Sequence, residues 1–187
     1  PIMWKFLCDE LKIKSVVDIG CGFGYSLDFF KKHLKLHGIG VEGSPKVQEL
    51  ALNRDAIKVH DYSKGPLTFP KNYDLAWSSE FVEHVSPQYV ENFISTFKCC
   101  KYIAITYASV GQTGHHHVNE NTENYWINLM MTHGLIFDRD LTVQLRSKTE
   151  EDFSRPTSPV DQSKVIGWTY PYHFSQKGLF FRNDLLL

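Results

Sequence analysis

The turn that follows residue 19 constrains the fold of this chain more than any other stretch of its sequence. A short apolar run, Val16–Ile19, carries Asp18 and leads into glycines at alternate positions: Gly20, Gly22 and Gly24. Apolar residues at helical spacing follow from Leu27, so the order predicts a strand, a tight turn and a helix. Glycine lets the backbone bend sharply and approach a ligand, and the helix after it offers free N–H groups. The stretch therefore predicts a turn that binds a flat, polar ligand such as a nucleotide.

The spacing of these glycines indicates which ligand the turn binds. A dinucleotide-binding turn has the pattern G-x-G-x-x-G, which would require glycine at the position of Tyr25. That pattern fails, and what remains is Asp18-x-Gly20-x-Gly22-x-Gly24. It resembles motif I of the class I S-adenosylmethionine (SAM)-dependent methyltransferases. The resemblance extends from residue 15 to about residue 106 and implies SAM as the cofactor and S-adenosylhomocysteine (SAH) as its product.

Length and composition favour one globular domain. With 187 residues the chain is long enough for one well-buried α/β domain and too short for two, so we expect residues 1–187 to form a single domain. An apolar content of 42% is ordinary, and no run approaches the ~20 apolar residues that cross a bilayer, so we expect no membrane association. The chain lacks an initiator methionine, which indicates either a Met-trimmed protein or a piece of a longer one.

Charge and cysteine content narrow the partners and the compartment. The chain has 20 basic and 21 acidic residues and no dense Lys/Arg run, so we expect no nucleic-acid partner. Its four cysteines show no C-x-x-C spacing, and an adjacent pair suits neither a disulfide nor zinc: Cys8, Cys21, Cys99 and Cys100. The first residues lack the basic start and cleavage site of a signal peptide. We expect a cytoplasmic protein.

The rest of the chain alternates between strand and helix patterns. Apolar and β-branched runs predict strands at residues 16–19, 39–42, 56–60, 73–78, 101–106, 135–138 and 178–182. Helical spacing predicts helices near residues 2–13, 27–34, 45–54, 86–97, 125–134 and 141–149, and a long loop over 150–176. This alternation implies an α/β fold with a mostly parallel sheet and helices on both faces. The resemblance implies a Rossmann-like class I methyltransferase sandwich with strand order 3-2-1-4-5-7-6 and strand seven antiparallel.

Acids at the ends of neighbouring strands fit the polar groups of SAM. Glu42 ends the second strand, 20 residues beyond Gly22, where an acid can accept hydrogen bonds from both ribose hydroxyls. Asp61 ends the third strand, placed to accept from the adenine amine, with Tyr62 beside it. Each acid alone is equally well explained as a turn or cap residue. Together with Asp18 and the glycine turn, they favour a cofactor site.

The predicted cofactor site includes the neighbours of these residues. Its members are Asp18, Gly20, Cys21, Gly22, Gly24, Tyr25, Glu42, Gly43, Asp61, Tyr62, Ser78 and Ser79. The two serines end a strand that leads into a Glu-His segment, which resembles the fourth-strand motif of the family. The resemblance implies that Ser78, Ser79 and Glu80 line the methyl-transfer centre.

Histidines at the same edge of the sheet are candidates for catalysis. His84 lies one helical turn after Glu80 and is either a base or a packing residue, the packing role being commoner for a lone histidine. The run His115–His117 follows the fifth strand; in extended backbone His115 and His117 share a face and His116 opposes them. Neutral imidazole accepts protons near pH 7 and binds divalent metals. The alternative is a solvated loop before a helix capped by Thr122.

The sequence leaves open whether the site binds a metal ion, because a His-x-His pair alone is weak evidence for zinc.

Two further features of the sequence bear on the methyl acceptor. The stretch Gly114–Asn119 with the Tyr-Trp helix after it also resembles methyltransferases found beside glycan-building genes, including those of phages and large algal viruses (chloroviruses). The second feature is a set of rings that either close over a sugar-like acceptor or cover a sheet edge: Trp168, Tyr170, Tyr172 and His173.

We therefore predict a SAM-dependent O-methyltransferase that acts on a hydroxyl of a saccharide or a similar small polar acceptor. His116 or His117 is the first candidate for the base and His84 the second, with Glu80 orienting or assisting. One alternative is an N- or small-metabolite methyltransferase on the same fold, which needs no strong base. The other is a SAM-binding interaction module within a larger glycan-assembly protein. The expected partners are a small-molecule or oligosaccharide acceptor and, in a longer chain, further domains.

Overall fold

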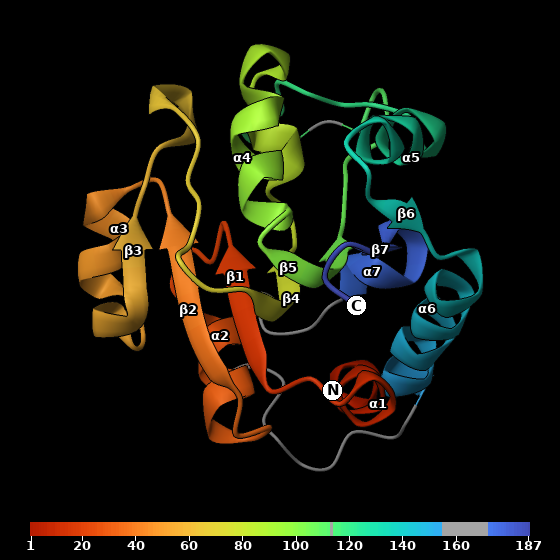
Figure 1. Cartoon of the computed structure of the whole chain (residues 1–187). Helices are drawn as coiled ribbons and strands as arrows, with labels where there is room; N and C mark the ends of the chain where they lie inside the picture. Colours follow the sequence, from red (N-terminus) through yellow and green to blue (C-terminus); the bar gives the residue numbers. More distant parts are fainter. Residues whose placement is uncertain (113, 155–171) are drawn as a thin grey trace.

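The strands form one mixed sheet. The computed structural model describes residues 1–112, 114–154 and 172–187. Its strands are β1 (Ser15–Ile19), β2 (His37–Glu42), β3 (Ile57–Val59), β4 (Tyr73–Ser78), β5 (Cys100–Ile105), β6 (Ile136–Phe137) and β7 (Leu179–Arg182). They lie in the order β3-β2-β1-β4-β5-β7-β6, with β7 antiparallel to both of its neighbours. The predicted fold class and strand order are confirmed, and β1 to β5 are parallel to one another. Figure 1 shows the arrowheads of β1, β2 and β3 pointing the same way.

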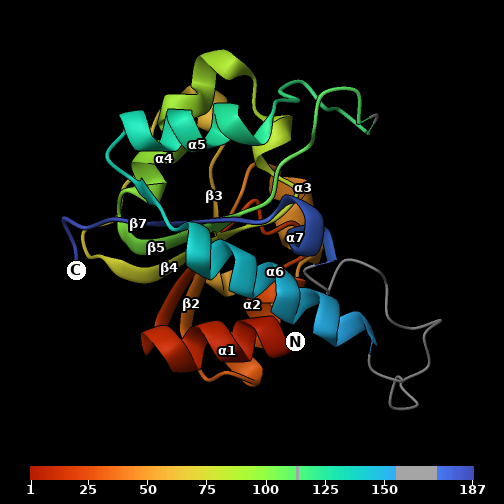
Figure 2. The same ribbon diagram turned by 90° about the vertical axis from the view of Figure 1, so that its right-hand side faces the viewer.

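Helices cover both faces of this sheet. The α-helices are α1 (Ile2–Leu11), α2 (Tyr25–Lys32), α3 (Pro45–Leu50), α4 (Val90–Phe97), α5 (Glu123–Thr132), α6 (Arg139–Ser154) and α7 (Tyr172–Lys177). Short 3₁₀ turns lie between them: η1 (Arg54–Ala56), η2 (Tyr62–Lys64), η3 (Val82–His84) and η4 (Pro87–Tyr89). Figure 2 shows α4 and α5 on one side of the sheet and α1, α2 and α6 on the other.

Within the described parts of the chain, none of the helices combines the length and the apolar character that crossing a bilayer requires.

Each face of the sheet has its own apolar core. On the α4 and α5 face, Phe93 and Trp126 are fully buried against strand residues such as Val17. On the other face, Trp4 of α1 meets Trp77 of β4 edge to face, with ring centroids 5.3 Å apart. Large aromatic side chains contribute the most apolar burial per residue, so these two layers fix the helices against the sheet.

The long loop predicted over residues 150–176 is wrong at both of its ends. Helix α6 continues to Ser154, and α7 occupies residues that carry no clear periodicity. The cause is tertiary packing, because Phe174 is fully buried and stacks on Trp77 with centroids 5.6 Å apart. Trp168 and Tyr170 lie outside the described residues. Other boundaries shift too, since α3 ends at Leu50 and β6 is only two residues long.

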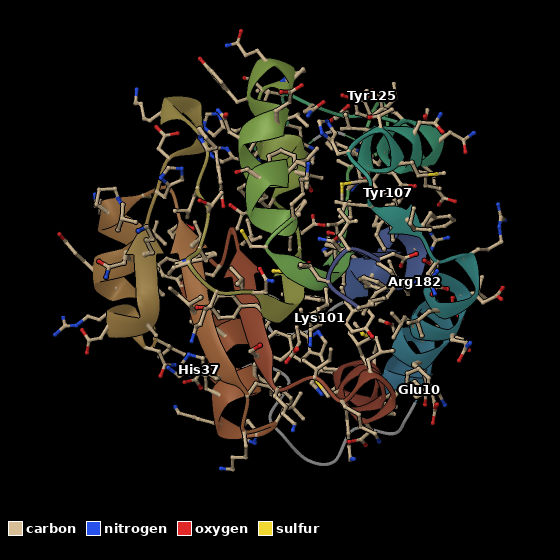
Figure 3. The ribbon with its side chains drawn as sticks, viewed as in Figure 1. Glu10, His37, Lys101, Tyr107, Tyr125 and Arg182 are labelled. Carbon is tan, nitrogen blue, oxygen red and sulfur yellow. The ribbon has the colours of Figure 1, made fainter. Side chains whose placement is uncertain are left out.

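A partly buried hydrogen-bond network joins β1, β4 and β5 at the amino ends of the sheet. The Asp74 carboxylate accepts hydrogen bonds from the backbone N–H groups of Lys14 and Ser15, at 2.9 and 3.0 Å. It also accepts one from the ammonium of Lys101, at 2.9 Å. Figure 3 shows Lys101 on β5 at this lower end of the sheet, away from Tyr107. Burial alone would raise the pKa of Asp74, but these hydrogen bonds outweigh it and lower the pKa below its ordinary value.

We expect Asp74→Asn to destabilise the protein by about 1–2 kcal/mol at pH 7, because the amide cannot accept from all of these donors. A carboxyl with a lowered pKa stabilises the fold above about pH 4 and loses that contribution as the pH falls through its folded pKa. The difference from the parent in urea unfolding should therefore shrink below pH 4. The fully exposed Asp55→Asn is the control. An equal difference at pH 3 and pH 7 would contradict this account.

Candidate active site

A pocket of about 630 Å³ opens at the carboxyl ends of the parallel strands. Ligands of open α/β sheets bind at this edge, and the volume lies in the usual range of roughly 300–1,000 Å³ for ligand sites. Its walls come from the turn after β1, the end of β2, the segment after β3 and the segment after β4. Ten of the predicted cofactor residues line it: Asp18, Gly20, Cys21, Gly22, Tyr25, Glu42, Gly43, Asp61, Tyr62 and Ser79.

The turn between β1 and α2 needs its glycines. Gly20, Gly22 and Gly24 have φ values of 73°, 51° and 75°, a region that L side chains rarely adopt. A Cβ on Gly20 would lie 2.4 Å from the Phe81 ring, and one on Gly24 would lie 2.7 Å from the Leu52 carbonyl oxygen. A Cβ on Gly22 would meet open space, and Gly22 lines the pocket. Gly24 itself is the N-cap residue of α2 and does not line the pocket.

Glu42 joins this turn to the end of β2. Its Oε2 accepts a hydrogen bond from the Gly22 N–H at 3.0 Å, and its Oε1 accepts one from the Ser44 N–H at 2.8 Å. Each carboxylate oxygen can accept a second hydrogen bond. Glu42 therefore holds the glycine turn in place and offers acceptor capacity toward the pocket that it lines.

Asp18 is a buried carboxyl that lines the pocket. Only 3% of its surface is exposed, and its Oδ2 has no hydrogen-bond partner among the residues that the structure describes. Burial raises the pKa of Asp18 to about 7, partly offset by the backbone N–H of Leu27, and the Glu42 charge raises it further. A buried carboxyl with an open oxygen suits a cationic ligand group, since such a group would supply the missing partner.

Asp61 and the two serines differ in how they meet the pocket. Asp61 is exposed and lines it, while its Oδ1 accepts from the Ser63 N–H at 2.8 Å. Hydrogen bonding to Ser63 lowers the pKa of Asp61, so this acid also serves as a cap. Ser79 lines the pocket as well. We predicted that Ser78 would line the pocket beside Ser79. The side chain of Ser78 is instead buried and donates to the Ile19 carbonyl oxygen at 3.0 Å. Successive side chains at a strand point to opposite faces, so the two serines face different ways.

The segment after β4 brings Glu80 to the pocket. Its φ is 52°, and its backbone N–H donates to the Thr106 hydroxyl oxygen at 2.8 Å. That hydroxyl in turn donates to Glu80 Oε1 at 3.0 Å. The Nδ1 of His173, on α7, lies 3.8 Å from the same Glu80 oxygen. Glu80 is therefore held in one orientation at the rim of the pocket, with an imidazole beside it.

Backbone hydrogen bonds bring the histidine run to His84. The Glu83 carbonyl oxygen accepts from the N–H groups of Val118 and Asn119, at 2.9 and 3.0 Å. As a result the rings of His84 and His117 lie 5.1 Å apart, although 33 positions separate them in the sequence. His84 lines the pocket and His117 lies behind it. His115 and His116 are exposed and do not line the pocket.

The hydrogen bonds of these two rings fix their tautomers. His84 Nδ1 lies 3.1 Å from the His116 carbonyl oxygen, and His117 Nδ1 lies 2.9 Å from the Gln112 carbonyl oxygen. A carbonyl only accepts, so each Nδ1 carries the hydrogen and each Nε2 of the neutral ring carries a lone pair. His116 contributes its backbone rather than its ring. The ranking from the sequence therefore changes, and His84 becomes the first candidate for contact with a substrate.

Sequence reasoning missed Glu83 and several pocket walls. Glu83 is fully buried directly before His84. The signal was the spacing Glu-x-x-Glu-His, which places two acids and an imidazole within five consecutive residues shortly after a strand end. Trp4, Phe81 and Tyr89 also line the pocket. They come from α1 and from the turns after β4, so only the folded chain brings them together.

Comparisons with known proteins agree with this geometry. Residues 5–147 match a family model described as a methyltransferase domain. A search of curated proteins gives no match. The O-methyltransferase from the trans-AT PKS multienzyme of Brevibacillus brevis, solved with SAH, covers 100% of this chain and 73% of its own at 17% identity and a TM-score of 0.59.

Two other solved structures are similar. The sugar N-methyltransferase KedS8 from Streptoalloteichus sp. ATCC 53650 shares 11% identity at a TM-score of 0.59, covering 73% of this chain and 78% of its own. The mitomycin 7-O-methyltransferase MmcR shares 17% identity at a TM-score of 0.54, covering 69% of this chain. This chain spans only 45% of MmcR. At such identities these structures establish the fold, and their acceptors differ.

We expect Asp18→Asn to stabilise the ligand-free protein above pH 7. The pKa of Asp18 in the fold, about 7, exceeds its ordinary value of 3.8. Its protonated form therefore favours the fold at low pH, and this contribution is lost as the pH rises through 7. The neutral amide avoids that loss, which we expect to be on the order of 1–3 kcal/mol at pH 8.

Thermal unfolding of both proteins from pH 4 to pH 8 measures this difference. It should be small at pH 4 and largest above pH 7, whereas the exposed Asp140→Asn should show no such trend. A variant that is less stable than the parent at pH 8 would refute a desolvated Asp18.

Proposed function

We propose that this chain methylates a hydroxyl of a saccharide or a similar small polar acceptor. The chain belongs to the methyltransferase-domain family and is a SAM-dependent methyltransferase of class EC 2.1.1. The family match establishes the methyl donor and the reaction type. We infer the acceptor from the corner of the pocket that holds Glu80 and His84.

The residues present fit the cofactor. The open oxygen of Asp18 can accept a hydrogen bond from the amino group of the methionine portion, and Glu42 can accept from the ribose hydroxyls. The backbone of Gly22 leaves room for close approach, because nothing lies where its Cβ would be. Bound SAM supplies an electrophilic methyl group on a sulfonium. The protein contributes by holding the acceptor oxygen in line with that group.

The observation that carries the choice of a hydroxyl is the pair of oriented imidazoles. His84 lines the pocket with its Nε2 free to interact, because its Nδ1 is held by the His116 carbonyl oxygen. An alcohol must lose its proton as the new bond forms, whereas a neutral amine needs no strong base to attack. A corner that combines His84, His117 and Glu80 therefore favours O-methylation over N-methylation.

A small polar acceptor suits the remaining walls. Ser86, Tyr89 and His173 line the same pocket and offer hydroxyl and ring surfaces without a fixed cation. Aromatic rings and hydroxyls are suited to the alternating C–H and O–H groups of sugars. The resemblance of Gly114–Asn119 to methyltransferases found beside glycan-building genes points the same way. An oligosaccharide panel is therefore the first acceptor screen, with amine acceptors as the comparison.

We expect Glu42→Gln to weaken SAH binding by about 10- to 100-fold. Hydrogen bonds to a charged acceptor contribute about 1.5–3 kcal/mol, and the amide can accept on one oxygen only. Calorimetric titration with SAH measures the change, and Glu49→Gln on the exposed face of α3 is the matched control. Equal affinity in all three proteins would remove Glu42 from the cofactor site.

We expect His84→Gln to lower kcat/KM for methyl transfer by about 10²–10⁴-fold while SAH affinity is unchanged. Transfer from labelled SAM to the acceptor panel, read by mass, measures the loss. His37→Gln, at the opposite end of the sheet (Figure 3), is the control. Full turnover in His84→Gln would refute the role of this corner. SAH binding without methylation of any acceptor would instead favour a SAM-binding interaction module.

A further inference from the structure

Three potential metal ligands converge behind the acceptor corner of the pocket. Glu83, His84 and His117 each offer one ligand atom, and these three atoms all lie within 4.8 Å of one another. Within the described residues this is the group of His, Cys, Asp and Glu side chains that meets the spacing of a metal site. First-row divalent ions hold nitrogen and oxygen ligands at about 2.0–2.2 Å, so neighbouring donors lie roughly 3–4 Å apart. A small movement of the rings would close the group around an ion.

The Glu83 carboxylate gives the strongest reason to expect a cation. The residue is fully buried, and neither of its carboxylate oxygens has a hydrogen-bond partner among the described residues. A buried carboxylate without a partner is costly, and natural proteins keep such groups paired or bound to metals. His84 and His117 are neutral when they expose a lone pair, so they cannot balance its charge. A divalent ion would supply the missing partner.

The two imidazoles are oriented as metal ligands usually are. A ligating histidine donates its other ring N–H to a carbonyl or carboxylate, which fixes the tautomer and the ring. His84 makes this contact with the His116 carbonyl oxygen at 3.1 Å. His117 makes it with the Gln112 carbonyl oxygen at 2.9 Å and with Glu120 Oε1 at 3.3 Å. Both Nε2 atoms are therefore left as the ligands.

The backbone holds His117 in this position. A Cβ on Gly114 would lie 2.2 Å from the His117 ring, so the ring packs directly over a glycine. The Glu120 side chain that contacts His117 also accepts from the Gly111 N–H at 2.9 Å. The loop after β5 is thus folded around one histidine, while His115 and His116 stay exposed.

We propose that Glu83, His84 and His117 bind a divalent metal ion, which in turn binds the hydroxyl that is methylated. The second half of this proposal rests on the proposed function. Three protein ligands without a thiolate leave coordination positions open, unlike a closed structural zinc site. Two imidazoles and a carboxylate suit Mn²⁺, Fe²⁺ or Zn²⁺. Glu80, on the pocket side, is held by Thr106 and lies three residues before Glu83.

The ion changes the roles of the residues at this corner. His84 and His117 become ligands, and a hydroxyl bound to the ion loses its proton more readily, as metal-bound water does. That proton passes to the Glu80 carboxylate. The hydroxyl oxygen then forms its bond to the methyl carbon, the carbon–sulfur bond breaks, and its electron pair stays on sulfur to give neutral SAH. No oxidant or reductant takes part.

Mn²⁺ titration of the metal-stripped protein, followed by loss of the free-ion signal in electron paramagnetic resonance, tests the site without reference to activity. We expect one Mn²⁺ per chain, with affinity lowered at least about tenfold in Glu83→Gln and in His117→Gln. Gly114→Ala should weaken binding in the same direction by displacing the His117 ring. His115→Gln, an exposed neighbour, should bind as the parent does. Circular dichroism of each variant is the control for correct folding.

The outcomes separate the two proposals. Absence of Mn²⁺ and Zn²⁺ binding, or equal binding in Glu83→Gln and His117→Gln, overturns the metal site. Methyl transfer that survives chelation also overturns it and returns the role of base to His84. Transfer that stops with EDTA and resumes with Mn²⁺ supports both proposals. Mn²⁺ bound at this site without methylation of any hydroxyl acceptor supports the site and counts against the proposed function alone.

Discussion

The hydrogen bond from the Gly22 N–H to Glu42 is the contact on which the rest of the site depends. It joins a turn whose glycines all have positive φ to the end of the next parallel strand. The turn can bend this way only because Gly20 and Gly24 have no Cβ, which would clash with Phe81 or with the Leu52 carbonyl. With the turn fixed, α2 begins at the pocket and Asp18 lies beneath it. The cofactor end of the pocket thus follows from a few local constraints.

Such local constraints are also what a sequence expresses best. The glycine turn, the acids at the strand ends and the alternation of strands with helices were all readable, because each depends on neighbours in the chain. The sheet order came from resemblance to a family, since periodicity alone does not set which strands pair. Helix α7 was missed for a related reason. Its place is fixed by Phe174 against Trp77, a contact between residues nearly 100 positions apart.

The acceptor corner shows where local reasoning stops. The sequence placed His116 and His117 near the sheet edge, but it could not say that the Glu83 carbonyl would bind Val118 and Asn119. That pair of hydrogen bonds decides which histidine faces His84. It also turns His116 outward, so that its carbonyl rather than its ring takes part. The sequence shows that Glu83 and His84 are adjacent, but only the folded structure shows that Glu83 is buried and His84 is exposed.

Two carboxyl groups at the site, those of Asp18 and Glu83, are buried without a full set of hydrogen-bond partners. Each has at least one carboxylate oxygen without a hydrogen-bond partner in the described chain. Each one costs stability as long as nothing positive lies beside it. Two such groups in one functional region are what we would expect of a site that binds cationic ligand groups at two points. Under our proposals, the amino group of the methyl donor would pair with Asp18 and a divalent metal ion would pair with Glu83, so cofactor and acceptor binding would each relieve a separate desolvated charge.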